Sequence, residues 1–415
     1  MRFILYALAL FSILIVVWLS SSWGAQRPVE QQQMTEENIT DKSIVLAESS
    51  MHRSPYKGLS SNGSMLEDGV ISWHENGQKE LAGKYENGEK NGVWTAWYEN
   101  GQKEFEGEYK NGEKDRVWIA WLENGEKAGQ ETYRSGRKTR EVIYKNGEQD
   151  GGWTVWYENG QKRRAVIYKH GKQDGVWTEW YKNGQKKGEG EFVGKVETGF
   201  VTRWYENGQK ESEGTYESGE PTGVITCWYE DGGPKSVGTY TNGKEDGVVT
   251  HWYGNRQKKE EGTYKNGDRD GAFTKWHENG QRKGEGTFKN GDENGVFTEW
   301  YENGQRKGEG TFKNGDKNGV FTEWYETGQK AEEGVFKNGD RDEIWISWYK
   351  NGQKDSMYII ESGGRSGTFT KWYENGQRHR EETYKNNEKD GVWIAWDETG
   401  QKQSEATYEN GKILD

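Results

Sequence analysis

The chain of 415 residues is poor in cysteine, proline and aliphatic side chains, and each shortage narrows what the protein can be. Its one cysteine, Cys227, excludes an intramolecular disulfide framework and a cysteine-rich zinc site. Hydrophobic residues make up only 30% of the chain and the mean hydropathy is −1.20, so we do not expect a thick aliphatic core. Only 4 residues are proline, which leaves most of the chain free to form regular backbone pairing.

A basic surface is also missing. The formal net charge is −12, and lysine and glutamate are interspersed along the chain instead of gathered in blocks. A protein that neutralises phosphates needs a basic stripe or patch. We therefore expect no nucleic-acid partner.

Aromatic residues and glycine are abundant instead. The chain contains 22 Trp, 23 Tyr, 12 Phe and 59 Gly. Disordered chains of similar charge are poor in aromatic residues, so this composition favours a folded protein. Glycine with aromatics and little proline is typical of β-structure with many turns.

The amino-terminal residues differ from all that follows. Arg2 precedes residues 3–19, in which only Ser12 is polar, and this pattern predicts that residues 1–25 are a signal peptide or an N-terminal membrane anchor, formed as an apolar helix. The polar residues 26–66 predict a flexible, disordered linker. The flanking charges predict that the remainder is membrane-anchored or secreted, outside the cytoplasm in the periplasm or at the cell surface.

Residues 67–415 repeat one unit of 24 residues about fourteen times, which is the signature of a repeat array. Each unit carries one tryptophan just before a turn sequence, called here the marker tryptophan. Twelve of the thirteen spacings between marker tryptophans are 24 residues, and the exception, Trp121 to Trp156, is 35. The marker tryptophans are Trp73, Trp97, Trp121, Trp156, Trp180, Trp204, Trp228, Trp252, Trp276, Trp300, Trp324, Trp348, Trp372 and Trp396.

Each unit predicts two short strands and two turns. The sequence Glu-Asn-Gly-Gln at residues 302–305 is a hairpin signal, because a type I′ turn needs positive φ at both central positions and Asn-Gly tolerates it. A second Asn-Gly, such as Asn314-Gly315, closes the other end of the unit. The whole is therefore predicted to be an all-β array of antiparallel hairpins.

A two-residue loop at Asn303-Gly304 would pair Trp300 with Lys307 and Phe297 with Gly310. Glycine opposite an aromatic residue lets the ring lie flat across the neighbouring strand, which offsets the cost of glycine in a strand. We expect the marker tryptophans and the turn glycine to be structural. The residues assigned this role are Trp97, Trp180, Trp204, Trp228, Trp252, Trp276, Trp300, Trp324, Trp348 and Gly304.

The motif Y-E-N-G-Q-K-x-G-E-G-x-Y-K-N-G-x-x-D-G-x-W resembles the MORN repeat, and more closely the bacterial MORN-variant repeat of proteins labelled antitoxins of the YwqK kind. The resemblance covers about residues 67–415. It implies hairpins stacked into an elongated, twisted, single-layer antiparallel sheet. It also implies a scaffold for membrane junctions or protein partners, of which an antitoxin or immunity role is a more specific form.

No residue is assigned to catalysis, to a metal or to a cofactor. His74 and His277 replace the tyrosine that follows a marker tryptophan, so we interpret them as sheet substitutions and not as bases. Residues 266–271 match the first six positions of an EF-hand loop, but its twelfth position is His277 instead of glutamate, which favours an ordinary turn over calcium. Glutamates such as Glu299 and Glu309 recur opposite lysines, as on a solvated sheet face, and are a weak basis for a glycosidase.

The aromatic columns remain as candidate interaction residues. A ladder of tyrosines on one face would suit a protein partner at the cell envelope or, as an alternative, the sugar rings of an envelope glycan. A partner strand added at a terminal edge of the sheet is a further possibility. The candidate partner-binding residues are Tyr157, Tyr181, Tyr205, Tyr229, Tyr253, Tyr301 and Tyr325.

Overall fold

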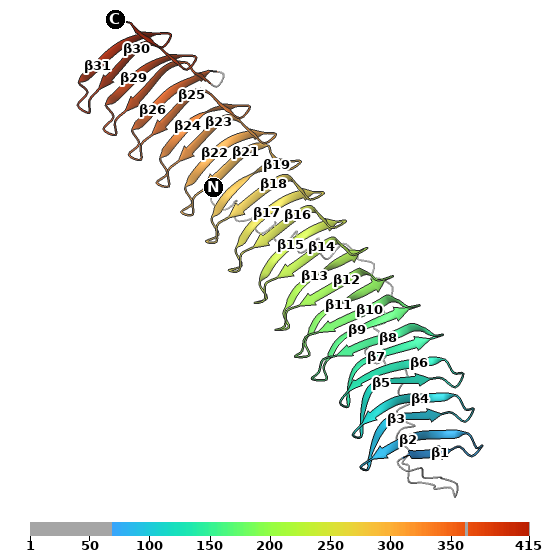
Figure 1. Cartoon of the computed structure of the whole chain (residues 1–415). Coiled ribbons are helices and arrows are strands. Elements are labelled where there is room, and N and C mark those ends of the chain that lie inside the picture. Colours follow the sequence, from blue (N-terminus) through green and yellow to red (C-terminus); the bar gives the residue numbers. More distant parts are fainter. Residues whose placement is uncertain (1–68, 362–363, 415) are drawn as a thin grey trace, which may run out of the picture. The chain divides into compact units, whose positions relative to one another are not determined.

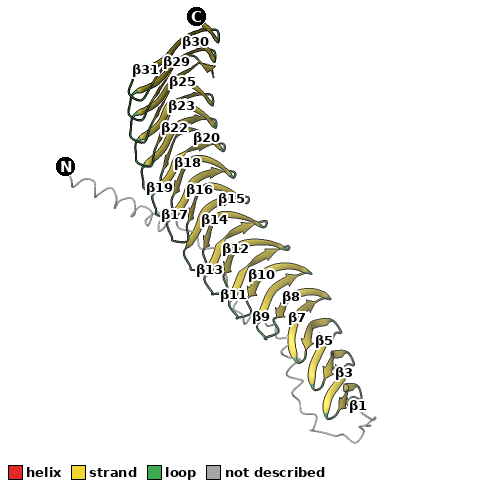
Figure 2. Cartoon of the chain, turned by 60° about the vertical axis from the view of Figure 1, so that its left-hand side comes forward, coloured by secondary structure: helices red, strands yellow, loops and turns green. Residues whose placement is uncertain are grey.

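A computed structural model of the chain describes residues 69–361 and 364–414 (Figure 1). All regular elements in these ranges are strands (Figure 2). None of the described residues forms a helix long and apolar enough to cross a membrane. The predicted apolar helix in residues 1–25 and the predicted linker in residues 26–66 lie outside the described residues. The all-β array of antiparallel hairpins is confirmed.

The chain divides into two compact units, which are described separately. The first includes the described residues up to Gly160 together with Tyr168–Gly171. Its strands are β1 (Gly69–Trp73), β2 (Lys79–Glu86), β3 (Glu89–Trp97), β4 (Lys103–Lys110), β5 (Glu113–Trp121), β6 (Lys127–Arg134), β7 (Arg137–Lys145) and β8 (Glu148–Trp156). Strand β9 (Lys162–Lys169) contributes to both units.

The second unit includes Gln161–Ile167 and the residues from Lys172 onward. Its strands are β10 (Lys172–Trp180), β11 (Lys186–Val193), β12 (Val196–Trp204), β13 (Lys210–Glu217), β14 (Glu220–Trp228), β15 (Pro234–Thr241), β16 (Lys244–Trp252), β17 (Lys258–Lys265), β18 (Asp268–Trp276), β19 (Arg282–Lys289), β20 (Asp292–Glu293), β21 (Gly295–Trp300), β22 (Arg306–Lys313), β23 (Asp316–Trp324), β24 (Lys330–Lys337), β25 (Asp340–Trp348), β26 (Lys354–Glu361), β27 (Gly364–Arg365), β28 (Gly367–Trp372), β29 (Arg378–Lys385), β30 (Glu388–Trp396), β31 (Lys402–Glu409) and β32 (Lys412–Leu414).

Within each unit, neighbours in the chain pair as antiparallel neighbours in the sheet. Strands β20 and β21 both pair with β19, and β27 and β28 both pair with β26, so each of these couples is one interrupted strand. Connections of two lengths alternate, and we call them short turns and long turns.

The short turns are the type I′ turns. At Asn314-Gly315 both residues have positive φ, 52° and 84°, and the flanking Lys313 and Asp316 pair directly. The long turns were expected to be the same type, and this was wrong. In the turn of residues 301–305, Gly304 has a φ of 82° but Asn303 is not left-handed.

The long turn is a three-residue loop. The Gly304 N–H donates to the Tyr301 carbonyl at 3.0 Å, and the Tyr301 N–H donates to the Gln305 carbonyl at 2.9 Å. This geometry fits a hairpin in which a left-handed glycine follows a type I turn. Asn303 stabilises it through its side chain, because its Oδ1 accepts from the Gln305 N–H at 2.9 Å.

The longer loop changes the register near the turn. Phe297 pairs with Gly310 as predicted, but Trp300 pairs with Arg306 instead of Lys307, with a bulge after Glu299. The extra loop residue places Tyr301 inside the turn and not in the strand.

The core is a ladder of rings on one face of each sheet, called here the ladder face. Phe297 and Phe312 lie edge to face with centroids 5.2 Å apart. The same contact continues along the sheet through Tyr264, Phe273, Phe288, Phe297, Phe312, Phe321, Phe336 and Trp345. Trp94 and Trp345 in this column are only 1% and 2% exposed, although the sheet has no second layer.

Glycine makes this burial possible, because every second ring of the ladder (Phe273, Phe297, Phe321 and Trp345) lies flat on a glycine of the preceding strand. A Cβ added to Gly310 would lie 2.2 Å from the Phe321 ring, and one added to Gly286 would lie 2.3 Å from the Phe297 ring. Such separations are far below van der Waals contact. The predicted role of glycine opposite aromatics is therefore confirmed.

The irregular spacing between Trp121 and Trp156 arises from one extra strand, β7. Both of its connections are short turns, Ser135-Gly136 and Asn146-Gly147. Successive connections of antiparallel strands lie at opposite edges of a sheet. The long turns of residues 98–102 and 122–126 therefore share one edge, whereas the next long turn, which begins at Tyr157, lies at the other.

The extra strand also exchanges the two faces. Trp118, in the ladder column, pairs with Glu131, which pairs with Glu141. Val142 instead pairs with Trp153, the ladder residue of the next unit. Because Glu141 and Val142 are neighbours in one strand, their side chains point to opposite faces, so the ladder changes face at β7.

Side-chain contacts agree with this exchange. Lysines equivalent to Lys127 lie over the marker tryptophan of the following unit, as Lys103 does over Trp121 at 5.5 Å. Lys127 lies over Tyr144 instead, at 4.1 Å. The hairpin that follows β7 is therefore rotated by 180° about the axis along which successive strands are added.

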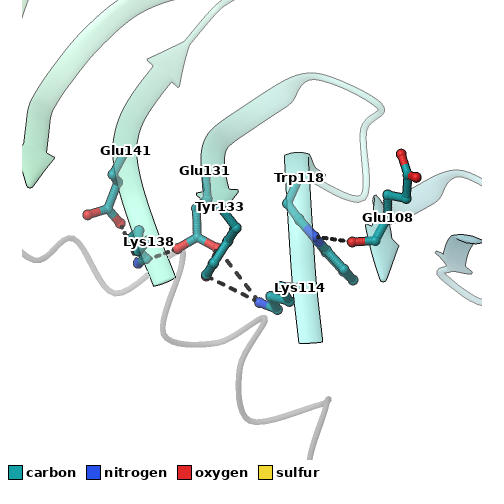
Figure 3. A network of polar contacts seen from close by, with 7 residues as sticks. All are labelled: Glu108, Lys114, Trp118, Glu131, Tyr133, Lys138 and Glu141. Carbon is teal, nitrogen blue, oxygen red and sulfur yellow. Dashed lines mark hydrogen bonds and ion pairs between the residues drawn. The ribbon is translucent and has the colours of Figure 1, made fainter. Parts of the chain in front are cut away.

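A buried ionic network ends the first ladder (Figure 3). Glu131 takes the place of the usual glycine, is 8% exposed and lies between Lys114, at 3.8 Å, and Lys138. Tyr133 donates its hydroxyl to the same carboxylate at 2.8 Å. Burial alone would raise the pKa of Glu131, but the ion pair and hydrogen bond with Lys138 lower it below its usual value, so the carboxylate stays charged.

We expect Gly310→Ala to destabilise the array by about 1–3 kcal/mol, because its methyl group would collide with the Phe321 ring. Gly308→Ala is the matched control in the same strand, since an added Cβ there meets nothing within 4 Å. Urea unfolding and hydrogen exchange of β22 measure the difference. Equal stability of the two variants would contradict the role given to the glycine column.

We also expect deletion of residues 134–144, combined with Glu131→Gly, to remove the exchange of faces and edges. The measurement is the distance between two spin labels, placed at Glu113 and Glu148, which are the first residues after short turns. Cys227 is replaced by serine so that only these two positions are labelled. In the natural chain they lie at opposite edges, one strand length or about 25 Å apart, whereas in the deleted chain they should lie two strands or about 10 Å apart. An unchanged distance would disprove the exchange.

Candidate interaction surfaces

The tyrosine that follows each marker tryptophan ties its unit to the next. Tyr301 donates its hydroxyl to the backbone carbonyl of Trp324 at 2.9 Å. The same bond, at 2.7–2.9 Å, joins Tyr181 to Trp204, Tyr205 to Trp228, Tyr229 to Trp252, Tyr253 to Trp276 and Tyr325 to Trp348. Tyr157 occupies the same position, and all seven of these rings are half-buried.

These hydroxyls are therefore engaged within the chain. Their assignment to partner binding stays a prediction, and it rests on the half-exposed ring faces alone. His74 and His277 take over the same bond, because their Nε2 atoms lie 2.7 and 3.0 Å from the carbonyls of Trp97 and Trp300. A carbonyl only accepts, so Nε2 carries the proton. Both histidines thus replace tyrosine in position and in bonding.

The turn asparagine makes a second tie at the same edge. Asn303 donates from Nδ2 to the Glu326 carbonyl of the next long turn at 2.9 Å. On the opposite edge, the Gly315 N–H donates to the Glu293 carbonyl of the preceding short turn at 2.9 Å. Neighbouring units are therefore joined at both edges in addition to their strand pairing.

Apart from the exposed Trp73, the marker tryptophans lie half-buried on the face opposite the ladder, called here the marker face. Most of them are approached by the first cation of the preceding hairpin, as Arg306 lies over Trp324 at 5.9 Å and Lys330 over Trp348 at 5.6 Å, whereas Pro234 takes this position before Trp252. Lys330 also binds Glu333, which accepts from Thr322 at 3.2 Å. The nine marker tryptophans assigned a structural role all share this half-buried setting.

The most exposed apolar side chains of the marker face are not among the residues predicted to bind a partner. An apolar residue four positions before the marker tryptophan forms a stripe of side chains that are 40–60% exposed. In the second unit we call these residues the valine stripe: Val176, Phe200, Val224, Val248, Val296, Val320, Ile344 and Val392. Val93 and Val117 occupy the same position in the first unit. Threonine often pairs with them, as Thr311 does with Val296. The signal was two adjacent apolar residues in most units, because only one of them can reach the ladder face.

A shallow hollow of about 430 Å³ lies between two neighbouring marker tryptophans, Trp276 and Trp300. Arg282 and Gln281 also line it, and Arg282 binds Glu285 at 2.8 Å. No three potential metal ligands among the described residues lie close enough to hold an ion.

Comparison with protein families finds the MORN repeat variant in eight segments of the chain. These are residues 90–111, 173–193, 198–218, 269–290, 293–314, 317–338, 365–386 and 389–410. The resemblance to the MORN repeat variant is therefore confirmed for these eight repeats. A search of curated proteins finds no match.

Solved structures give only weak likenesses. A crystal structure of TcdB2-TccC3 shares 10% identity over 82% of this chain and 18% of its own, with a TM-score of 0.13. A Tc holotoxin pore of Photorhabdus luminescens shares 9% identity over 82% and 22%, also with a TM-score of 0.13. This chain spans less than a quarter of either, and likenesses at this level carry no argument about fold or function.

We expect Tyr349→Phe to destabilise the long-turn edge by about 0.5–1.5 kcal/mol, because Tyr349 donates to the Trp372 carbonyl at 2.8 Å. Burial, aided by a hydrogen bond to Asp355, raises the pKa of Tyr349 to about 12. A raised pKa favours the folded state while the phenol is protonated, so this contribution is full below about pH 10 and is lost as the pH rises through about 12. Urea unfolding between pH 8 and 12 measures it.

Tyr349→His is the matched control, since histidine keeps a donor at this position in two other units. It should retain more stability than Tyr349→Phe. A Tyr349→Phe chain as stable as the natural one at neutral pH would contradict the tie between units.

Proposed function

We propose that this protein, eight of whose segments match the MORN repeat variant, is a non-catalytic scaffold that binds a protein partner along its valine stripe. The observation that supports this most strongly is the stripe itself. Its apolar side chains are 40–60% exposed and recur at a fixed position of the unit. Contiguous exposed apolar surface of this kind marks interaction sites on soluble domains.

The other apolar surface has a different use. The ladder rings lie flat on glycine and are covered by cations, as Lys317 covers Phe321 at 4.9 Å and Phe336 at 4.8 Å. The tyrosines of the long turns are tied to neighbouring carbonyls. Together these contacts leave the valine stripe as the apolar column most accessible to a partner.

The place of action that we propose is the cell envelope. It rests on the apolar run of residues 3–19 with Arg2 before it, as expected for a signal peptide or membrane anchor. An antitoxin-like partner would be one form of this function. We favour a protein partner over an envelope glycan, because cationic side chains such as Arg306 and Lys330 lie over the marker tryptophan rings on which a sugar would stack.

The test is retention of a partner from host extract by the full-length chain and by two variants. Replacing Val248, Val296 and Val320 with serine should abolish retention of a discrete protein without unfolding the array, because all three side chains are more than half exposed. The control replaces three exposed turn residues, Glu278, Glu302 and Glu326, with glutamine, and should retain the partner.

Retention that survives loss of the three valines would contradict the proposed surface. Retention of a polysaccharide instead of a protein would establish the glycan reading and overturn this one. A purified chain that turns over a substrate, and loses that activity on a single substitution, would disprove the non-catalytic assignment.

A further inference from the structure

The valine stripe widens at one place in the second unit. Val193 and Val196 flank the short turn between β11 and β12, pair with each other and are 56% and 42% exposed. In every other unit this pair of positions contains at least one charged residue. The commonest occupants are a lysine and an acidic residue, as in Lys313 and Asp316.

The two valines lie on the same face as the stripe. Val196 and Phe200 are an even number of residues apart in β12, so their side chains point to the same face. Phe200 pairs with Thr215, one of the threonines that pair with stripe residues on that face. Phe200 is 60% exposed and is the only aromatic residue in the valine stripe. Val176 and Val224 lie two strands away on either side, beyond the exposed Glu191 of β11 and Thr215 of β13, and with Val193, Val196 and Phe200 they form what is called here the Phe200 patch.

Opposite charges border this patch on its two sides. Lys172 is the first residue of β10 and Glu220 is the first residue of β14, and both are exposed. They occupy the same position of the unit as Val196, two strands away in either direction. The two ends of the patch therefore differ in charge, basic at the start of β10 and acidic at the start of β14, and Glu191 adds one carboxylate between Val176 and Phe200.

We propose that the Phe200 patch binds a second copy of this chain, face to face, about a two-fold axis that runs along β12. This rotation places Phe200 on Phe200, Val176 opposite Val224, and Lys172 opposite Glu220. Both ion pairs form, one on each side of the axis, as an isologous interface requires. Glu191, which pairs with Val176 in β11, falls opposite Thr215.

The charges select this orientation over the alternative. A two-fold axis through Phe200 at right angles to the strands would keep β10 on β10 but reverse its direction, so Lys172 would fall opposite Trp180 and neither ion pair with Glu220 would form. A partner of another sequence would need to supply a matched basic, apolar and acidic order, which a second copy supplies by symmetry. Aligned face-to-face packing of two sheets about 10 Å apart is a common arrangement.

Sedimentation velocity of the full-length chain over a range of concentrations tests the proposal. The natural chain should form a dimer, and Phe200→Ser should weaken it by at least about tenfold, because a central aromatic residue contributes twice to a two-fold interface. Val320→Ser is the matched control: it changes an equally exposed stripe residue outside the patch and should leave the dimer intact.

Charge exchange gives a second readout that does not depend on removing apolar surface. Lys172→Glu and Glu220→Lys should each weaken the dimer, and the double variant should restore it. A monomeric natural chain, a dimer indifferent to Phe200→Ser, or a double variant no tighter than the single ones would each overturn the proposal. The stripe residues that test the proposed function lie outside the patch, so the two proposals fail independently.

Discussion

The array depends on the contact between an aromatic ring and the glycine beneath it. A single sheet has no second layer to bury its apolar side chains, and the usual solution of packing a helix or another sheet on it is not used in the described residues. Glycine lets the ring of one strand lie on the backbone of its neighbour, so that Phe321 on Gly310 gains the contacts that a second layer would supply. Each strand therefore finds both its backbone hydrogen-bond partners and its core contacts in the strands next to it.

The ties at the two edges follow from this arrangement. Once rings hold successive hairpins at a fixed spacing, the Tyr301 hydroxyl and the Asn303 amide reach the next long turn at ordinary hydrogen-bond distances. The Gly315 N–H does the same between short turns. Stability thus accumulates from many equivalent local contacts, as in other repeat arrays.

The sequence predicted the hairpin array and the pairing of Phe297 with Gly310, because period, turn residues and alternation are local signals. It did not predict which Asn-Gly forms the type I′ turn, since the same dipeptide serves both turns and only the flanking pairing distinguishes them. It also missed the tie made by Tyr301, because a bond to a residue 23 positions away depends on how units stack. The valine stripe was not predicted, because function was assigned to the aromatic residues alone.

The extra strand β7 has a consequence for how the chain melts. The series of side-chain-to-carbonyl bonds made by His74 and Tyr98 reaches Trp121 and stops, because the Leu122 side chain has no donor and the next connection at that edge is the short turn at Asn146. The ladder of rings stops at the same point on the charged network of Glu131. We therefore expect loosening that begins in β1 to meet a boundary before β8, where strand pairing and the contacts of Arg134 and Arg137 with Glu158 continue but the ring ladder and the ties between long turns do not. Eleven inserted residues can thus weaken the cooperativity of a sheet whose strand pairing is unbroken.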